Sequence, residues 1–293
     1  MYDKNYKMID LHSHSNLSDG ALSPEELIEL AIKSGLKVLA ITDHNCINKN
    51  LPYLQNIYRE KISLPSGCEF SCGYRTVQGR LIQIHLGGIG FGIEDPDIIR
   101  IIEYNNLAMQ PYMESILERL KNCGIDLCSY DELMFRSHSI SVGRRHIAVE
   151  MVNQKIVKDT DEAFNRFLSE GKPAYVSNAT NYASLSDIVH AVVNSNGIIS
   201  INHLLKYDLS YAEIDGLLSE FKQLAGSQGA LEVYYSAYND EQQFFLHKLA
   251  QSYGLLESCG SDYHGHKDST IKDLGYFPYE IYDKMVRAAR PSV

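Results

Sequence analysis

Histidines and carboxylates recur in this chain where short apolar runs end, a pattern suited to holding metal ions. His12 and His14 are two residues apart, and Asp262 and His264 repeat that spacing near the other end of the chain. On a strand, residues two apart point to the same face, so each pair can present both side chains to one site. The candidate ligands are His12, His14, Asp19, His44, Glu69, His85, His203, Asp262 and His264.

These residue types indicate which chemistry is possible. Imidazoles combined with carboxylates favour Zn, Mn or Fe, and a carboxylate can bridge two ions. One histidine at a strand end is most often structural. Six histidines of the set fall at expected strand ends, which chance placement explains poorly, so the pattern predicts a polynuclear metal site. His190 and His247 lie in helical patterns and are expected to be structural, and no role is assigned to His138 or His266.

Alternating strands and helices would bring these distant residues together. Ser23, Pro24 and Glu26 open the first helix with a capping box. Strands are expected at 8–11, 36–41, 61–64 (running on to Glu69), 81–85, 198–201 and 230–233, and later helices at 188–194, 212–224 and 242–253. This order indicates an α/β fold of parallel strands with helices outside, either a barrel or a doubly wound sheet. In such folds the carboxyl ends of the strands meet at one rim, where active sites form.

The middle of the chain breaks this alternation. Helical patterns dominate residues 98–171, and Pro111 is expected to kink or divide the first of them. We therefore expect a discontinuous barrel domain, 1–97 and 172–293, with a small, mainly helical domain inserted at 98–171.

Composition narrows the function classes. The chain has 293 residues, with 27 Lys and Arg against 37 Asp and Glu, a net charge of −10. Such a chain is poorly suited to gripping long duplex nucleic acid, which needs a broad basic surface. No apolar run is long enough to span a bilayer, and segment 1–7 is too polar for a secretory signal. The six cysteines form no CxxC pair, as expected for reduced thiols in a cytoplasmic protein.

Ordered motifs along nearly the whole chain resemble the PHP family, named for polymerase and histidinol phosphatase. The motifs are His12-Ser13-His14, Ile41-Thr42-Asp43-His44, Gly67-Cys68-Glu69, His85-Leu86-Gly87-Gly88, Gly143-Arg144-Arg145-His146 and Gly260-Ser261-Asp262-Tyr263-His264. The later motifs are similar to the branch of small stand-alone phosphoesterases with a helical insertion. Members of that branch remove the 3′-phosphate from nucleoside 3′,5′-bisphosphates or trim short RNA from its 5′ end.

The resemblance implies a distorted seven-stranded PHP barrel with two or three divalent ions, Mn first, with Fe or Zn as alternatives. It assigns His12, His14, Glu69 and Asp262 to one ion, and Glu69 (bridging) with His85 to a second. It assigns Asp19, His44, His203 and His264 to a third. Asp43 would orient a ligand from behind.

The resemblance also implies substrate contacts. It makes Arg144 and His146 contacts to the substrate, and Lys172 is given the same role. An arginine grips phosphate with two parallel hydrogen bonds, so Arg144 would anchor a second, non-reacting phosphate. Three departures concern this part of the site: Asn202-His203-Leu204 replaces Ala-His-Pro, Asn45 follows His44, and Arg145 replaces the proline of Gly-Arg-Pro-His.

The expected activity is hydrolysis of a phosphate ester in a small nucleotide or a short oligonucleotide end. Closely spaced ions would generate a hydroxide that attacks phosphorus directly, and no G-x-S-x-G elbow offers a covalent route. One alternative is a phosphomonoesterase for a metabolite such as histidinol phosphate. Another is a catalytically silent PHP module stabilised by metal.

Overall fold

The computed structural model describes residues 8–266 and 270–289. Segment 1–7, for which we expect no secretory signal, lies outside the described residues. Within the described part of the chain, no helix has both the length and the apolar character needed to cross a membrane. All six cysteines are free; Cys46, Cys68, Cys72 and Cys259 are buried, Cys128 is half-buried and Cys123 is exposed.

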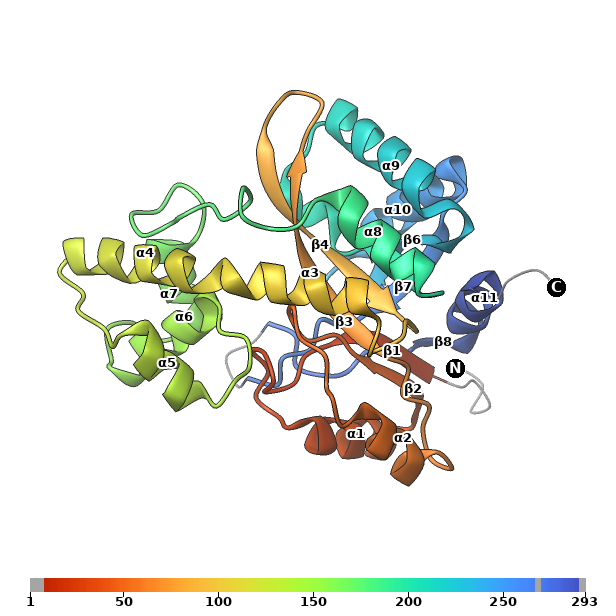
Figure 1. The fold of residues 1–293 in the computed structure, drawn as a ribbon, viewed down its shortest axis with the longest axis horizontal. Coiled ribbons are helices and arrows are strands. Elements are labelled where there is room, and N and C mark those ends of the chain that lie inside the picture. Colours follow the sequence, from red (N-terminus) through yellow and green to blue (C-terminus); the bar gives the residue numbers. More distant parts are fainter. Residues whose placement is uncertain (1–7, 267–269, 290–293) are drawn as a thin grey trace.

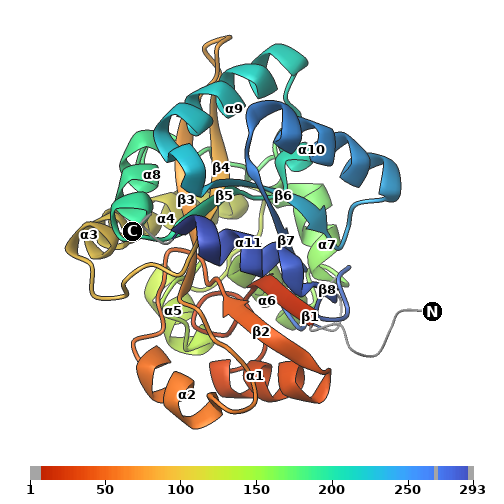
Figure 2. The same ribbon diagram turned by 90° about the vertical axis from the view of Figure 1, so that its right-hand side faces the viewer.

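Two sheets form a distorted barrel (Figure 2). The smaller sheet has the order β2-β1-β8, made of β1 (Met8–Ser13), β2 (Leu36–Ile41) and β8 (Phe277–Pro278). The larger sheet runs in chain order through β3 (Gly67–Arg75), β4 (Leu81–Ile89), β5 (Ile198–Ile201), β6 (Gly229–Tyr235) and β7 (Leu256–Gly260). Parallel bridges from Ser13 to Tyr263 and from His44 to Glu69 join the two sheets. The expected distorted α/β barrel is thereby confirmed.

The strands are not all parallel, which corrects one expectation. β1 with β2, β5 with β6, and β6 with β7 are parallel, but β3 with β4 and β4 with β5 are antiparallel. Only residues 76–80 connect β3 to β4, too few for the crossover that parallel strands need. The strand expected at 61–64 is a single bridge, Ser63 to Val38. Glu69 therefore stands near the beginning of β3 rather than at a strand end.

Helices cover the outside of the barrel much as expected. α1 (Pro24–Lys33) and α2 (Leu51–Tyr58) lie together on one side, and Ser23 and Glu26 form the capping box of α1 (Figure 1). The later helices are α8 (Leu185–Asn194), α9 (Tyr211–Ala225), α10 (Asp240–Tyr253) and α11 (Tyr279–Ala289), with short 3₁₀ turns at Leu204–Tyr207 and Gly226–Gln228. Apolar residues of α8, α9 and α10 pack on β3–β6 in the largest core cluster.

The inserted segment is helical and has its own core. It contains α3 (Pro96–Leu107), α4 (Met109–Asn122), α5 (Tyr130–Ser137), α6 (Arg144–Asn153) and α7 (Thr160–Ala163), the last followed by a π-helical turn, Phe164–Leu168. α4 to α7 lie to one side of the barrel (Figure 1). Their shared core begins at Met109, whereas Ile98 and Ile101 of α3 pack in the barrel core. The domain limits at 98 and 171 stay a prediction, and this packing favours counting α3 with the barrel.

Pro111 divides the first helical stretch, but the break lies three residues before the proline, at Ala108. α3 ends at Leu107, and Pro111 is the third residue of α4. In an unbroken helix the ring of Pro111 would meet the carbonyl of Leu107, four residues earlier. The break at Ala108 removes that clash and leaves proline in a first turn, where its missing N–H is not needed.

Candidate metal centre

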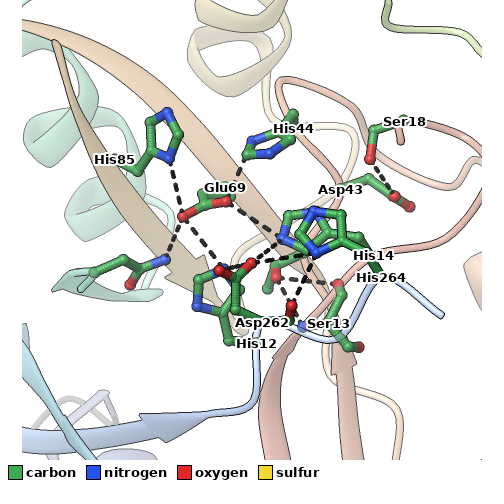
Figure 3. A network of polar contacts seen from close by, with 12 residues as sticks. His12, Ser13, His14, Ser18, Asp43, His44, Glu69, His85, Asp262 and His264 are labelled. Carbon is green, nitrogen blue, oxygen red and sulfur yellow. Dashed lines mark hydrogen bonds and ion pairs between the residues drawn. The ribbon is translucent and has the colours of Figure 1, made fainter. Parts of the chain in front are cut away.

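The candidate ligands converge at one rim of the barrel (Figure 3). His12 lies in β1, Glu69 in β3 and His85 in β4, and the other ligands follow the ends of strands. His203 and Asp262, the second residues after β5 and β7, have positive φ values of 33° and 60°. Such a backbone is unfavourable for residues other than glycine and is typical of functional sites. Gly260 lets β7 approach β1, because a Cβ there would come within 2.0 Å of the Cβ of His12.

Three groups of ligand atoms form among the described residues, and in each group all atoms lie within 4.8 Å of one another. The first group is fully buried and comprises His12, His14, Glu69 and Asp262. The second comprises His44, Glu69 and His85, and the third His14, Asp19, His44 and His264. Shared members make the three groups one continuous centre rather than separate sites.

Glu69 lies at the middle of this centre and is completely buried. Its Oε1 is 3.3 Å from His12 Nε2, 3.4 Å from His85 Nδ1 and 3.1 Å from His203 Nε2. Its Oε2 is 3.4 Å from His14 Nε2 and 3.2 Å from His44 Nδ1. Each oxygen thus faces one histidine of the first group and one of the second, so Glu69 lies where a carboxylate could bridge two ions.

His203 lies beside Glu69, not beside Asp19 as the family resemblance implied. Its ring centroid is 5.3 Å from that of His85 and 5.8 Å from that of His12. The group around Asp19 instead includes His14. The antiparallel pairing of β4 with β5 explains this placement, since it brings the end of β5 next to His85.

Several histidines are held from behind by a second polar group. Glu232 Oε1 is 2.8 Å from His12 Nδ1, and its other oxygen accepts the backbone N–H of His203 at 2.7 Å. The Tyr207 hydroxyl contacts His203 Nδ1 at 3.0 Å, and the carbonyl of Asp262 lies 2.8 Å from His264 Nδ1. In all three imidazoles Nδ1 is occupied and Nε2 faces the centre, which fixes tautomer and orientation.

Two buried aspartates hold the backbone around the ligands. Asp43 accepts hydrogen bonds from the amide and hydroxyl of Ser15 and from the hydroxyl of Ser18, in the loop that carries Asp19. Asp10 accepts from the amide and hydroxyl of Ser261, next to Asp262. Burial raises the pKa of both aspartates, and these hydrogen bonds oppose the rise. The structure thus places Asp43 behind a ligand loop, not among the ligands.

The charges and unpaired atoms fit divalent cations. Burial opposes ionisation of Glu69, yet nearby His12 holds its pKa well below the usual range. Burial lowers the pKa of His14, but the carboxylates of Asp262 and Glu69, 3.2 and 3.4 Å from its Nε2, raise it to about 10. The buried carboxylates therefore need a cation beside them. Within the described part of the chain, His12 Nε2, both ring nitrogens of His14, and Glu69 Oε2 are buried without a hydrogen-bond partner, as metal ligands would be.

Two basic side chains with no predicted role flank the centre. Arg145 Nε is 3.6 Å from Asp19 Oδ2, and Lys206 Nζ is 3.1 Å from Asp262 Oδ2. In both aspartates Oδ1 faces the histidines and Oδ2 faces the base. Lys206 also lies 4.6 Å from the ring centroid of Tyr235. Glu232 was missed too, although a carboxylate inside an apolar strand is a recognisable sign of a buried partner.

The three predicted substrate contacts lie in different surroundings. Arg144 donates to the carbonyl of Leu168 at 3.3 Å and packs near the rings of Phe164 and Tyr175. Lys172 is exposed. His146 lies near the centre, with Nε2 3.1 Å from the hydroxyl of Ser139.

A cavity of about 160 Å³ separates the inserted helices from the loop of Asp19. Its walls come from α5, α6 and three loops, and include Asp19, Gly20, Leu133, Arg136, Ser137, Ser139, Arg145, His146, Val149, Glu150, Asn153 and His266. His266, to which no role was assigned, lies with Nε2 2.7 Å from the carbonyl oxygen of Asp19. The cavity therefore adjoins the metal centre along Asp19.

Known proteins resemble this chain over most of its length. Residues 10–257 match the PHP domain. A 3′,5′-nucleoside bisphosphate phosphatase from Chromobacterium violaceum is 33% identical over 273 residues, covering 92% of this chain and 90% of that protein. A 5′-3′ exoribonuclease from Haemophilus influenzae is 29% identical, covering 88% and 90%. Among solved structures, an amidohydrolase from Chromobacterium violaceum, with bound sulfate and no metal, has a TM-score of 0.81 at 30% identity, covering 94% and 96%.

Proposed function

The chain belongs to the PHP family and is a metal-dependent phosphoesterase, and we propose that its substrate is a small nucleotide. The first candidate is a nucleoside 3′,5′-bisphosphate that loses its 3′-phosphate, as the name of the Chromobacterium violaceum relative suggests. The second is a short RNA hydrolysed from its 5′ end, as the name of the Haemophilus influenzae relative suggests. The observation that carries the proposal is the buried Glu69, which is shared by two groups of candidate ligands and has histidines within 3.4 Å of both its oxygens.

We assign the ions by the three groups of ligand atoms. His12, His14, Glu69 and Asp262 would hold the first ion; Glu69 and His85, with His203 alongside, the second; and Asp19, His44 and His264 the third. We propose Mn, with Fe or Zn as alternatives, because the donors are nitrogen and oxygen without thiolate. Divalent ions held there lower the pKa of water and neutralise charge on the phosphate.

The protein's own residues prepare the site for this chemistry. Glu232 and Tyr207 keep Nε2 of His12 and His203 directed at the centre. Lys206, held by Asp262 and 46% exposed, places a positive charge where the centre opens to solvent. Burial of the first group excludes water from the ligand side, so that charges act in a medium of low dielectric constant.

The proposal of a small substrate is supported by charge and size. A net charge of −10 repels long nucleic acid, whereas a nucleotide can be drawn in by local cations. The adjoining cavity, about 160 Å³, suits part of a nucleotide and not a duplex. We also propose a cytoplasmic location, which the six free cysteines support.

The test is phosphate release from adenosine 3′,5′-bisphosphate with added Mn²⁺, with Asp262→Asn as the control variant. Short RNA and histidinol phosphate are assayed in parallel. Rapid release of the 3′-phosphate, lost in the variant, is the expected result. Turnover of histidinol phosphate alone would replace the proposal with a metabolite phosphatase. Metal binding without turnover of any substrate would favour a silent, metal-stabilised module.

A further inference from the structure

Arg145 lies at the boundary between the metal centre and the adjoining cavity. Its Nε is 3.6 Å from Asp19 Oδ2, and its Nη1 is buried with no hydrogen-bond partner among residues 8–266 and 270–289. A buried guanidinium N–H without an acceptor is costly, and such groups are normally paired. The side chain is 23% exposed, so a ligand in the cavity can reach the guanidinium. The geometry around Arg145 is that of a cation prepared for an anionic ligand.

The neighbouring arginine provides a contrast on the same helix. Arg144 and Arg145 are the first two residues of α6. Arg144 points toward the π-helical turn, where it donates to the carbonyl of Leu168 and packs near two aromatic rings. Arg145 lines the cavity instead. Successive residues of a helix point about 100° apart, and in α6 this turn directs Arg145 to the cavity and Arg144 away from it.

The other ionisable groups of the cavity leave the charge of Arg145 uncompensated on that side. Arg136 is paired with Glu150 at 2.6 Å. His146 and His266 carry imidazoles rather than carboxylates, so neither offsets the charge of Arg145. Asp19 directs its other oxygen to the histidines of the centre, the nearest being His264 at 3.3 Å.

His146 adds a hydrogen-bonding path next to this charge. Its Nδ1 accepts the backbone N–H of Gly143 at 3.1 Å, so the proton of the neutral ring is on Nε2. Nε2 donates to the hydroxyl of Ser139, 3.1 Å away, and that hydroxyl donates in turn to the carbonyl of Ser137 at 3.4 Å. Both side chains line the cavity with Arg145. Gly143 at the N-cap adds no side chain, so the positive end of the α6 dipole is open there.

We propose that Arg145 binds the phosphate of the substrate that is not hydrolysed, and so selects doubly phosphorylated nucleotides over monophosphates. This inference rests on the proposed function and deepens it. Asp19 lies between Arg145 and the histidines, with one oxygen toward each, so a phosphate on Arg145 occupies the cavity and not the metal centre. Arginine suits this role because its planar fork makes two hydrogen bonds to one phosphate.

The kinetic test compares Arg145→Gln with Arg144→Gln on adenosine 3′,5′-bisphosphate and on adenosine 3′-monophosphate. Arg145→Gln should raise KM for the bisphosphate roughly 10- to 100-fold, the loss of a charged hydrogen-bonding contact, and leave the monophosphate unaffected. Arg145→Lys keeps the positive charge but lacks the planar fork. Its KM for the bisphosphate should lie between that of the wild type and that of Arg145→Gln. The reverse pattern, with the effect at Arg144, would overturn the proposal. An equal loss on both substrates would also overturn it, since Arg145 would then act through Asp19.

A binding measurement separates this inference from the proposed function. Calorimetric titration with adenosine 5′-monophosphate, which carries only the non-reacting phosphate, should show binding to the Mn²⁺-loaded wild type and a matching loss in Arg145→Gln. Metal content of the two proteins, measured alongside, should be equal. Failure of the wild type to hydrolyse any nucleotide would reject the proposed function, while this titration would still report on Arg145. Equal binding by both proteins would reject the role of Arg145.

Discussion

The barrel rim and the inserted helices supply polar side chains to neighbouring parts of one site, but in different ways. On the rim, His12, His14 and Glu69 are buried, and His12 is fixed from behind by Glu232. On the inserted side, Arg145 has a single long contact to Asp19 and an unpaired Nη1. Several contacts fix each side chain on the rim in one orientation, whereas the inserted face still has a hydrogen-bond donor without an acceptor. We therefore propose that the barrel carries out the reaction chemistry and that the insertion selects the substrate.

The largest expected effect comes from neutralising the shared ligand of the rim. Glu69→Gln removes the charge that faces two ligand groups, so both should lose metal. Activity should fall by about 10³-fold or more, because bound ions supply several kcal/mol and each ~1.4 kcal/mol is tenfold. Metal analysis by mass spectrometry and initial rates would check this. Full metal content with near-normal activity would contradict the assignment of Glu69 as a bridge.

A smaller effect is expected where the rim is held from behind. Glu232→Gln leaves one oxygen where two donors, His12 Nδ1 and the backbone N–H of His203, each need an acceptor. Metal affinity should drop roughly 10- to 100-fold, as is usual for such orienting partners. Glu257→Gln is the matched control. Glu257 lies on β7, next to the strand of Glu232, and it too accepts from an imidazole, that of His247, and from the hydroxyl of Tyr234. Equal losses in both variants would point to general destabilisation.

On the inserted face, a single contact should matter less. In His146→Asn the amide oxygen can stand in for Nδ1 and accept from Gly143, while the group at Nε2 is lost. We expect a several-fold rise in KM for the bisphosphate with kcat unchanged, because only a neutral hydrogen bond is removed. Steady-state kinetics would measure it. A fall in kcat with constant KM would place His146 in the reaction chemistry and blur the division between the two regions.

The smallest effect on activity is expected far from both regions, at the ion pair of Arg80 and Glu213. Arg80 binds both oxygens of Glu213, at 2.8 and 3.0 Å, and this hydrogen bonding lowers the pKa of Glu213 from 4.5 to about 2. A carboxyl whose pKa is lower in the folded than in the unfolded state stabilises the fold at pH values above its unfolded-state pKa. That stabilisation is lost as the pH falls through its folded-state pKa. Arg80→Ala should therefore lower Tm at pH 7, with the difference shrinking between pH 4.5 and 2. Melting curves across pH would check this, and kcat should not change.

Much of the fold follows from local patterns, and its main error has a local cause. The apolar runs at 198–201 and 230–233 became β5 and the central part of β6, because short buried runs between capped helices have few alternatives. The direction of β4 was misjudged, since an alternation of strands and helices was extended across a five-residue turn. Pro111 was rightly expected to divide the helical stretch. The break lies three residues earlier, at Ala108, because the proline ring would otherwise meet the carbonyl of Leu107.

The centre could be anticipated because metal ligands must be certain residue types, and those types stand out at strand ends. The division of these ligands into three groups could not be anticipated, because spacing along the chain does not fix which imidazole faces which carboxylate. His203 lies at Glu69 only because β4 and β5 are antiparallel. Lys206 was passed over and Arg145 was noted without a role, since surface cations are common and only packing shows which of them lie against a carboxylate.

The order of residues therefore specified the identity of the ligands and most elements that carry them. Tertiary structure decided the groupings, the orientation of each imidazole, and the choice of Arg145 over Arg144 as the cation facing the cavity. The reason is physical: hydrophobic periodicity and capping act over a few residues, whereas a ligand's partners lie up to 250 positions away and meet only when the barrel closes, as Asp10 and Ser261 do across 251 residues.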